Sequence, residues 1–144
     1  KPYYIGCTVD EKWHNYQIFA KWYYDNYIDS YCLDKDILYK NNKVYSEATC
    51  CFVPNAINAV LTLSTKSRGL YPVGVYKRGD TFRSIISING KQVSLGTFLT
   101  PDLAFQAYKL NKEAYIKHLA DYYKDTITKA CYNALYNWEI TIKD

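Results

Sequence analysis

The sequence predicts an α+β protein, and two kinds of local signal support this fold class. Two turn signals, Arg78-Gly79-Asp80 and Asn89-Gly90, separate runs that are rich in β-branched and aromatic residues. Asn-Gly indicates a tight hairpin because both central residues of such a turn need positive φ. A helix start, Thr100-Pro101-Asp102, follows the third run. We expect an N-terminal helix and a ββα unit, then a three-stranded antiparallel sheet packed on a helix, and a C-terminal helix.

The three strands are expected at residues 74–78, 81–88 and 92–96, with Thr100 as the N-cap of the helix and Pro101 in its first turn. Alternate side chains of a strand point to opposite faces. The inner face, which the helix covers, then holds Phe82, Ser84, Ile86, Ile88, Val93 and Leu95. The outer face holds Arg83, Ile85, Ser87, Gln92 and Ser94 and is flanked by Lys77, Arg78 and Lys91.

The outer face is a small polar platform. A β-ribbon of this kind can enter a major groove, where Arg or Gln reads base edges and Lys contacts phosphates. A solvated sheet face without a ligand is the alternative that composition leaves open.

The same stretch carries a family resemblance. Gly74-Val75, Leu95-Gly96-Thr97-Phe98, Thr100-Pro101 and the helix with Ala104, Ala107 and Tyr108 resemble the Apetala-type DNA-binding domain of plant ethylene-response factors, which also occurs in phage and bacterial homing endonucleases. The resemblance covers about a third of the chain. It implies that DNA would be contacted by Tyr76, Arg78, Arg83, Ile85, Ser87, Gln92 and Ser94. The plant domains carry more Arg and Trp on this face.

Length and charge set the remaining bounds. The chain has 144 residues and a formal net charge of +4, an excess that permits nucleic-acid binding without demanding it. It has no Met, so we expect that a segment before Lys1 was cut away or left unseen. No apolar run is long enough to span a bilayer and no signal-peptide pattern is present. We expect no membrane partner and a cytoplasmic location, the host cytoplasm if the protein is phage-encoded.

Five cysteines lack paired CxxC spacing, and the two histidines, His14 and His118, do not complete a zinc site. Buried free thiols in a reducing compartment are the better interpretation. Further upstream, apolar and aromatic residues recur at helical spacing from about Asp10, a plausible N-cap, to Tyr27. We expect this aromatic stripe to pack against the segment that follows it.

That segment predicts a ββα unit: a strand over 33–38, a polar turn over 40–43, a strand over 44–54 and a helix start near Asn55. The order resembles the HNH (His-Me finger) nuclease motif. By that resemblance Lys35 stands where the general-base His would be, Thr49 stands at the loop Asn, and Asn58 matches the third position. Asp34 and Asn58 would be weak ligands of a divalent metal, Mg or Mn, if the nuclease alternative holds; otherwise we expect no cofactor.

A lysine near its reference pKa of about 10.4 is protonated at neutral pH and cannot activate water. The neighbouring carboxylates Asp34 and Asp36 are expected to raise the pKa of Lys35 further. Cleavage is therefore expected to be lost, and Lys35 could instead contact a phosphate. His14 and His118 are better explained as structural histidines than as replacement bases.

A linker is expected at residues 63–72, where Ser, Thr, Gly and Pro accompany the basic Lys66 and Arg68. It would join a unit at 1–62 to a unit at 73–144. In the latter, the helix after Thr100 is expected to break near Asp125, with a second helix over 127–138. The apolar stripe of that C-terminal helix packs on the core or, alternatively, forms a homodimer or protein-partner face.

These features predict a double-stranded DNA-binding protein of phage or mobile-element type, derived from an HNH homing endonuclease and without cleavage activity. The first alternative is a metal-dependent nicking endonuclease of the HNH type. The second is a phage protein that binds a host or virion protein instead of DNA. The missing His separates the first two hypotheses, and the sparsely charged outer face keeps the third open.

Overall fold

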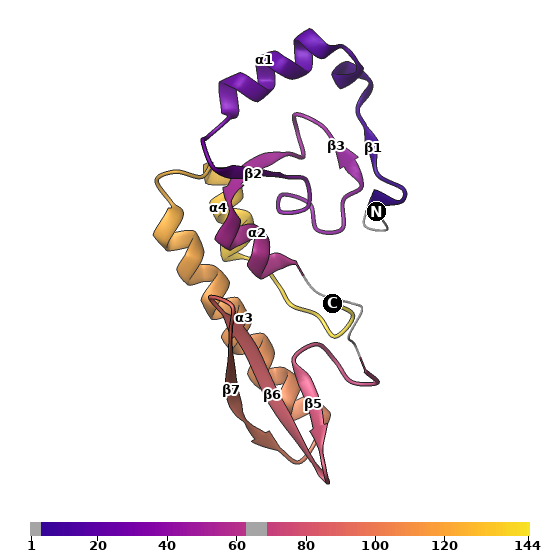
Figure 1. Cartoon of the computed structure of the whole chain (residues 1–144), viewed down its shortest axis with the longest axis vertical. Coiled ribbons are helices and arrows are strands. Elements are labelled where there is room, and N and C mark those ends of the chain that lie inside the picture. The colour runs from indigo at the N-terminus through magenta and orange to yellow at the C-terminus, as the bar shows by residue number, and fades with distance from the viewer. Residues whose placement is uncertain (1–3, 63–68) are drawn as a thin grey trace.

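A computed structural model describes residues 4–62 and 69–144, and it has the expected α+β architecture. Figure 1 shows an elongated molecule with the three-stranded sheet β5–β7 at one end and helix α1 at the other, joined by the long helix α3 and the ββα region. In chain order the elements are β1 (Thr8–Val9), the 3₁₀ helix η2 (Glu11–His14), α1 (Tyr16–Asn26), β2 (Tyr31–Asp34), β3 (Val44–Tyr45), β4 (Cys51–Pro54), α2 (Asn55–Leu61), β5 (Val75–Arg78), β6 (Thr81–Ile88), β7 (Lys91–Phe98), α3 (Pro101–Tyr123) and α4 (Lys129–Tyr136).

The expected three-stranded antiparallel sheet is confirmed, in the order β5-β6-β7. Asn89 and Gly90 both have positive φ, as the hairpin turn requires. Strand β7 is longer than the expected 92–96 because Lys91, Thr97 and Phe98 also pair with β6, and it contains a bulge: Ser84 pairs with Gly96, whereas the next residue, Ile85, pairs with Ser94. The extra residue, Leu95, turns inward beside Phe98, and both pack against the core.

Helix α3 covers the inner face of the sheet and contacts all three strands. Thr100 caps it by accepting a hydrogen bond from the backbone N–H of Leu103 at 3.2 Å, and Pro101 occupies its first turn, both as expected. Ala104 and Tyr108 of α3 are buried in the same core cluster as Val75 and Ile86 of the sheet.

The N-terminal helix is not continuous, so the prediction of one helix over 10–27 is wrong. Asp10 caps the 3₁₀ helix η2, and Asn15, with extended backbone angles, interrupts the chain before α1. The Asn15 side chain accepts hydrogen bonds from the backbone N–H groups of Gln17 and Ile18. A residue that satisfies these first N–H groups begins a new helix rather than continuing an old one.

The aromatic stripe of η2 and α1 packs on the following segment, as expected. Phe52 of β4 lies at its centre, with ring centroids 5.8 Å from Trp22, 5.3 Å from Tyr23 and 5.8 Å from Tyr27. Trp13 of η2 packs on Trp22 at 4.8 Å and is buried. This aromatic cluster attaches α1 to the ββα unit.

The ββα unit is present, but its strands are shorter than predicted. β2 pairs with β4 in antiparallel register and α2 follows directly. The predicted strands over 33–38 and 44–54 are wrong in extent because Asp34 ends β2 and a turn at 46–49 divides the second run. Thr49 stabilises that turn, since its Oγ1 donates to the carbonyl of Val44 at 2.7 Å. β3, the first part of the run, instead pairs in parallel with β1.

The C-terminal helix is shorter than the predicted 127–138 but carries the expected apolar stripe. α3 ends at Tyr123, close to the expected break, and Thr128 caps α4. Ile127, Cys131 and Leu135 are buried in one cluster that extends from Val53 and Ile57 of the ββα unit to the sheet. The core is thus continuous across the predicted 1–62 and 73–144 units, and within this chain the stripe packs on the core.

Cysteines and membrane features add little to the architecture. All five cysteines are free thiols, and the expected burial holds for Cys50, Cys51 and Cys131 but not for Cys7 and Cys32, which are only half-buried. Across residues 4–62 and 69–144, no helix has both the length and the apolar character needed to cross a membrane.

Candidate nucleic-acid interface

The register of the sheet places all seven residues implied by the ethylene-response-factor resemblance on one face. Tyr76 pairs with Arg83, and Arg78 pairs with Thr81 next to the first turn. On the other side of β6, Ile85 pairs with Ser94 and Ser87 with Gln92. Directly paired residues point to the same side of a sheet, and α3 covers the opposite side. We call this set the reading face: Tyr76, Arg78, Arg83, Ile85, Ser87, Gln92 and Ser94.

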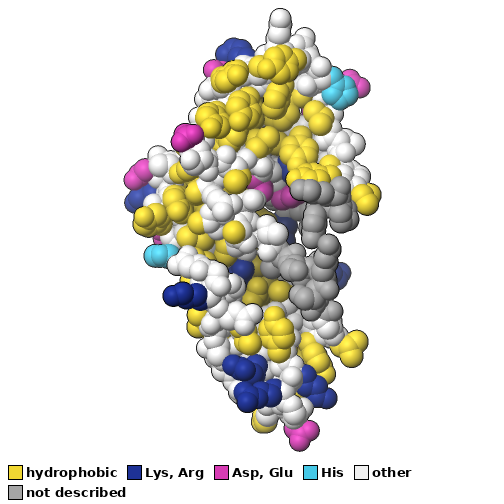
Figure 2. Space-filling view, in the orientation of Figure 1, with side chains coloured by type: hydrophobic (Ala, Val, Ile, Leu, Met, Phe, Trp, Pro, Cys, Tyr) yellow, Lys and Arg dark blue, Asp and Glu magenta, His cyan; other side chains and the backbone are white. Residues whose placement is uncertain are grey.

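The reading face is accessible and its positive charges are not neutralised. Tyr76 is 51% exposed, Arg78 is exposed and Arg83 is half-buried between the flanking strands. Neither arginine forms an ion pair with any residue of the described ranges. Figure 2 shows dark-blue Lys and Arg side chains gathered near the end of the molecule where Figure 1 places the β5–β6 turn. An unpaired guanidinium on an open sheet can donate to phosphates or base edges.

Lys77 and Lys91 lie on the other side of the sheet. Lys77 pairs with Phe82 and Lys91 pairs with Ile88, both of which face α3. The two lysines are exposed because they stand at opposite ends of the sheet, beside its two turns. They lie at the two edges of the reading face, next to the turns, and do not belong to the face itself. The remaining predicted DNA contacts, Lys66 and Arg68, lie outside the described residues.

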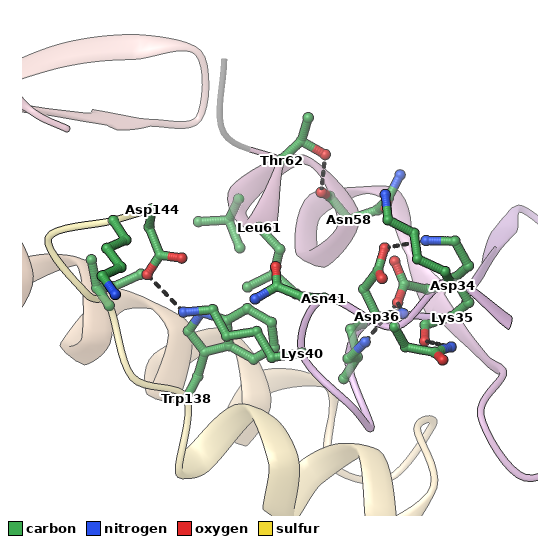
Figure 3. A pocket seen from close by; sticks show the side chains of 16 residues that line it. Asp34, Lys35, Asp36, Lys40, Asn41, Asn58, Leu61, Thr62, Trp138 and Asp144 are labelled. Carbon is green, nitrogen blue, oxygen red and sulfur yellow. Dashed lines mark hydrogen bonds and ion pairs between the residues drawn. The ribbon is translucent and has the colours of Figure 1, made fainter. Parts of the chain in front are cut away.

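Of the four HNH-like positions, three lie together and one does not. Asp34, Lys35 and Asn58 line a pocket of about 430 Å³ between the 34–43 segment, the end of α2 and the C-terminal tail. Figure 3 shows Asp34, Lys35, Asp36 and Asn58 on one side of this pocket and Trp138 and Asp144 on the other. Thr49 is not part of its lining and instead holds the turn between β3 and β4.

Asp34 is held by the backbone that follows it. Its Oδ1 accepts hydrogen bonds from the N–H groups of Asp36 at 2.7 Å and Ile37 at 2.8 Å. Burial raises the pKa of the Asp34 carboxyl, and the two backbone hydrogen bonds oppose this shift only in part. The carboxylate therefore ends β2 by an Asx-type turn as well as lining the pocket.

Lys35 is buried, at 8% exposure, and its ammonium is already engaged. Nζ lies 2.7 Å from a carboxylate oxygen of Asp36 and 5.6 Å from the ring centroid of Tyr45. Burial alone would lower the pKa of Lys35, but the hydrogen bond and charge of Asp36 overcome it and the pKa is raised. The direction agrees with the sequence-based expectation. Lys35 stays protonated at neutral pH and has little surface with which to contact a phosphate.

The described residues contain no group of three or more His, Cys, Asp or Glu side chains arranged to hold a metal ion. Asp34 and Asn58 would supply one carboxylate and one amide oxygen, fewer than the six oxygen ligands that Mg²⁺ takes, so water would have to supply most of them. Neither His14 on η2 nor His118, which stacks on Tyr115, belongs to the pocket lining.

Several residues of the pocket were not anticipated from the sequence. Lys40 donates to the Asp144 carboxylate at 2.7 Å and to the Glu139 carbonyl at 2.6 Å, and it lies over the ring of Trp138. These contacts join positions about a hundred residues apart, and no local pattern encodes them. The ion pair helps to lower the pKa of Asp144, although burial acts in the opposite direction.

Comparison with known proteins returned no match: no protein-family model, no curated protein and no solved structure matches this chain.

Proposed function

We propose that the protein binds double-stranded DNA through the reading face and does not cut it. One observation carries the proposal: seven residues chosen from a family resemblance, and spread over three strands, share one exposed face of the sheet. That face carries two arginines without ion-pair partners among the described residues.

The chemistry of the reading face suits a major groove. Arg83 lies in the middle strand, where its guanidinium can donate two hydrogen bonds to a guanine edge, and Gln92 can pair with adenine. The half-buried Ile85 offers an apolar contact to a thymine methyl group. Arg78, beside the first turn, and the rim lysines Lys77 and Lys91 are suited to phosphates.

The absence of cleavage rests on Lys35. A general base must be unprotonated to accept a proton from water, and the contact with Asp36 keeps this ammonium charged. The resemblance of the ββα unit to HNH nucleases then reflects descent from a homing endonuclease of phage or mobile-element type whose base has been lost.

Retardation of duplex DNA at two salt concentrations tests the proposal. The double variant Arg78→Ala with Arg83→Ala should weaken binding, and the loss of Arg78, the proposed phosphate contact, should reduce the salt dependence by roughly one phosphate-equivalent. Lys12→Ala with Lys124→Ala is the matched control, because it removes the same charge from exposed positions outside the sheet. Equal binding by both double variants would contradict the assignment of the reading face.

A supercoiled plasmid incubated with magnesium or manganese tests the second part. We expect retardation without nicks. The nicking-endonuclease alternative is favoured by one observation, namely that Asp34 and Asn58 line the same pocket. Metal-dependent nicks that Asp34→Ala abolishes would establish that alternative. If the protein neither retards nor nicks DNA, the result would favour a protein partner.

A further inference from the structure

The pocket between the 34–43 segment, the end of α2 and the C-terminal tail is large enough for a small molecule and has an apolar wall. Its volume of about 430 Å³ lies in the range of roughly 300–1,000 Å³ that is typical of ligand sites. The apolar wall consists of the buried Val60 and Ile140 and the partly buried Leu61 and Trp138. Such a wall can hold the apolar body of a ligand but does not orient it.

A second wall is polar because the chain turns there. All four residues of the 40–43 turn line the pocket, although only alternate residues of an extended segment would point to one side. Asn41 has a φ of +65°, a left-handed conformation that Asn tolerates. The Asn42 amide holds the turn by donating to the carbonyl oxygens of Lys35 at 2.9 Å and Val44 at 2.6 Å. Figure 3 shows Asn41 inside the pocket, beside Leu61.

The C-terminal tail, which supplies part of the apolar wall, is also held in place. The backbone N–H of Ile140 donates to Glu113 at 2.9 Å, and its carbonyl accepts from Lys109 at 2.8 Å. The contact of Lys40 with Asp144 joins the tail to the polar turn. The walls are therefore formed without a ligand, and a preformed site loses little conformational freedom on binding.

The charges of the lining favour an anionic ligand. Four lysines and three aspartates line the pocket, which leaves an excess of positive charge. Lys35 pairs with Asp36 and Lys40 pairs with Asp144, each at 2.7 Å. Lys43 belongs to neither pair and forms no ion pair with any residue that the structure describes. Its ammonium is thus available to a negatively charged group.

Two amides of the lining are available as well. The side chains of Asn41 and Asn58 form no hydrogen bond within residues 4–62 and 69–144. They come from different elements, the 40–43 turn and α2, and both line the same pocket. A few polar groups that converge on an apolar cavity are what orients a ligand in a binding site.

We propose that this pocket binds a small organic anion, a phosphate- or carboxylate-bearing molecule with a flat apolar body. The anionic group accepts hydrogen bonds from Lys43 and from the amides of Asn41 and Asn58, and the body lies against Leu61 and Trp138. The lining residues come from the ranges 34–62 and 138–144, whereas the reading face lies on the three-stranded sheet. The inference is therefore independent of DNA binding.

A titration of the full chain with phenyl phosphate, followed by NMR of the tryptophan indole N–H groups, tests the inference. Trp138 lines the pocket, whereas Trp13 and Trp22 pack on each other in the aromatic cluster, so only the Trp138 signal should move. For a ligand of this size we expect a dissociation constant of about 10⁻³ M or tighter. Inorganic phosphate lacks the apolar body and benzylamine carries the opposite charge, so each should bind roughly tenfold more weakly or worse.

Substitutions test the anion contacts. Lys43→Ala and Asn41→Gly should each raise the dissociation constant of phenyl phosphate roughly tenfold, because each removes a hydrogen bond to a charged group. Glycine keeps the positive φ of residue 41. Lys124→Ala is the matched control, since Lys124 is exposed and lies outside the lining. Circular dichroism checks that each variant is folded.

Four outcomes would overturn the proposal. They are a Trp138 signal that does not move up to about 10⁻² M phenyl phosphate, inorganic phosphate or benzylamine binding as tightly as phenyl phosphate, unchanged binding by both pocket variants, and displacement of phenyl phosphate by a short DNA duplex, which would indicate the DNA backbone as the occupant. Arg78→Ala with Arg83→Ala should leave phenyl phosphate binding unchanged, so this inference and the proposed function can fail separately.

Discussion

Gly74 lies directly against the ring of Tyr108, so closely that a Cβ at residue 74 would overlap the Cγ and Cδ2 atoms of the tyrosine. Gly74 also has a φ of +77°, a conformation that disfavours residues with a side chain. Its carbonyl accepts a hydrogen bond from the backbone N–H of Ile85 at 2.9 Å. This one contact joins the start of the sheet to the middle of α3.

Gly74→Ala should therefore destabilise the protein by about 3 kcal/mol, through overlap with the buried Tyr108 ring and a strained φ. Urea unfolding measures the loss. Gly79→Ala is the control, since Gly79 has a φ of +61° but nothing within 4 Å of a Cβ, and it should cost only about 1 kcal/mol. Equal losses from the two substitutions would show that the contact with Tyr108 contributes nothing.

Ser84, in the middle of the inner face, is fully buried, and its hydroxyl has no hydrogen-bond partner among the described residues. A buried hydroxyl without a partner loses its hydration and gains nothing in return. Ser84→Ala should raise the free energy of unfolding by up to about 1 kcal/mol. Ser87→Ala, on the exposed reading face, should change it by less than about 0.5 kcal/mol. A clear loss of stability in Ser84→Ala would indicate a partner for the hydroxyl.

Lys112 is 6% exposed, and burial lowers the pKa of its ammonium below the usual 10.5. It forms no ion pair with the residues described, and its Nζ lies 6.0 Å from the ring centroid of Tyr108. The folded chain binds this proton less tightly than the unfolded chain, so protonation of Lys112 lowers the free energy of unfolding. This penalty is absent above pH 10.5, where Lys112 is neutral in both states, and it is complete once the pH has fallen below the lowered pKa of the folded state.

Lys112→Met should accordingly stabilise the protein at neutral pH by about 1 kcal/mol, and the gain should shrink as the pH rises toward 10.5. Thermal or urea unfolding across this pH range measures it. Lys129→Met serves as the control because Lys129 is exposed on α4. A gain that stays constant with pH would show that the substitution acts through packing rather than through the buried charge.

Phe52 is the contact that attaches α1 to the rest of the molecule, because its ring meets those of Trp22, Tyr23 and Tyr27. Phe52→Ala should cost about 3–5 kcal/mol and reduce the near-ultraviolet circular dichroism of the aromatic cluster. Tyr16→Ala, at a 73% exposed position on α1, should leave both the stability and the near-ultraviolet spectrum nearly unchanged. An unaltered spectrum in Phe52→Ala would contradict the central position of this ring.

The sheet and the start of α3 could be predicted because their signals are local. Asn89-Gly90 specifies its own turn, alternation assigns each residue of β6 to a face, and Thr100-Pro101 begins a helix whatever surrounds it. The bulge at Leu95 was not predictable, since it depends on how β7 fits both β6 and α3. The register around it nevertheless keeps Ile85 opposite Ser94 on the reading face.

The N-terminal half was less predictable for the same physical reason. Helical periodicity continues across Asn15, but the Asn15 side chain caps the first N–H groups of α1 and its extended backbone separates α1 from η2. The aromatic contacts of α1 with Phe52, a residue distant in sequence, are not visible in that periodicity. The predicted strand over 44–54 is divided, and its first part, β3, pairs in parallel with β1, which lies about 35 residues earlier in the chain. Strand pairing between distant segments is not encoded in either segment alone.

By itself, the sequence determined the α+β class, the three-stranded sheet, the identity of its outer residues and the presence of Lys35 where the HNH resemblance implies a His. Only the tertiary structure decided which groups meet. It brought Lys40 to Asp144 across the pocket, buried Lys112 and the α4 stripe, and left the leucines of α3 exposed. Turns, caps and alternation depend on a few adjacent residues, whereas burial and charge pairing depend on segments that only the folded chain brings together.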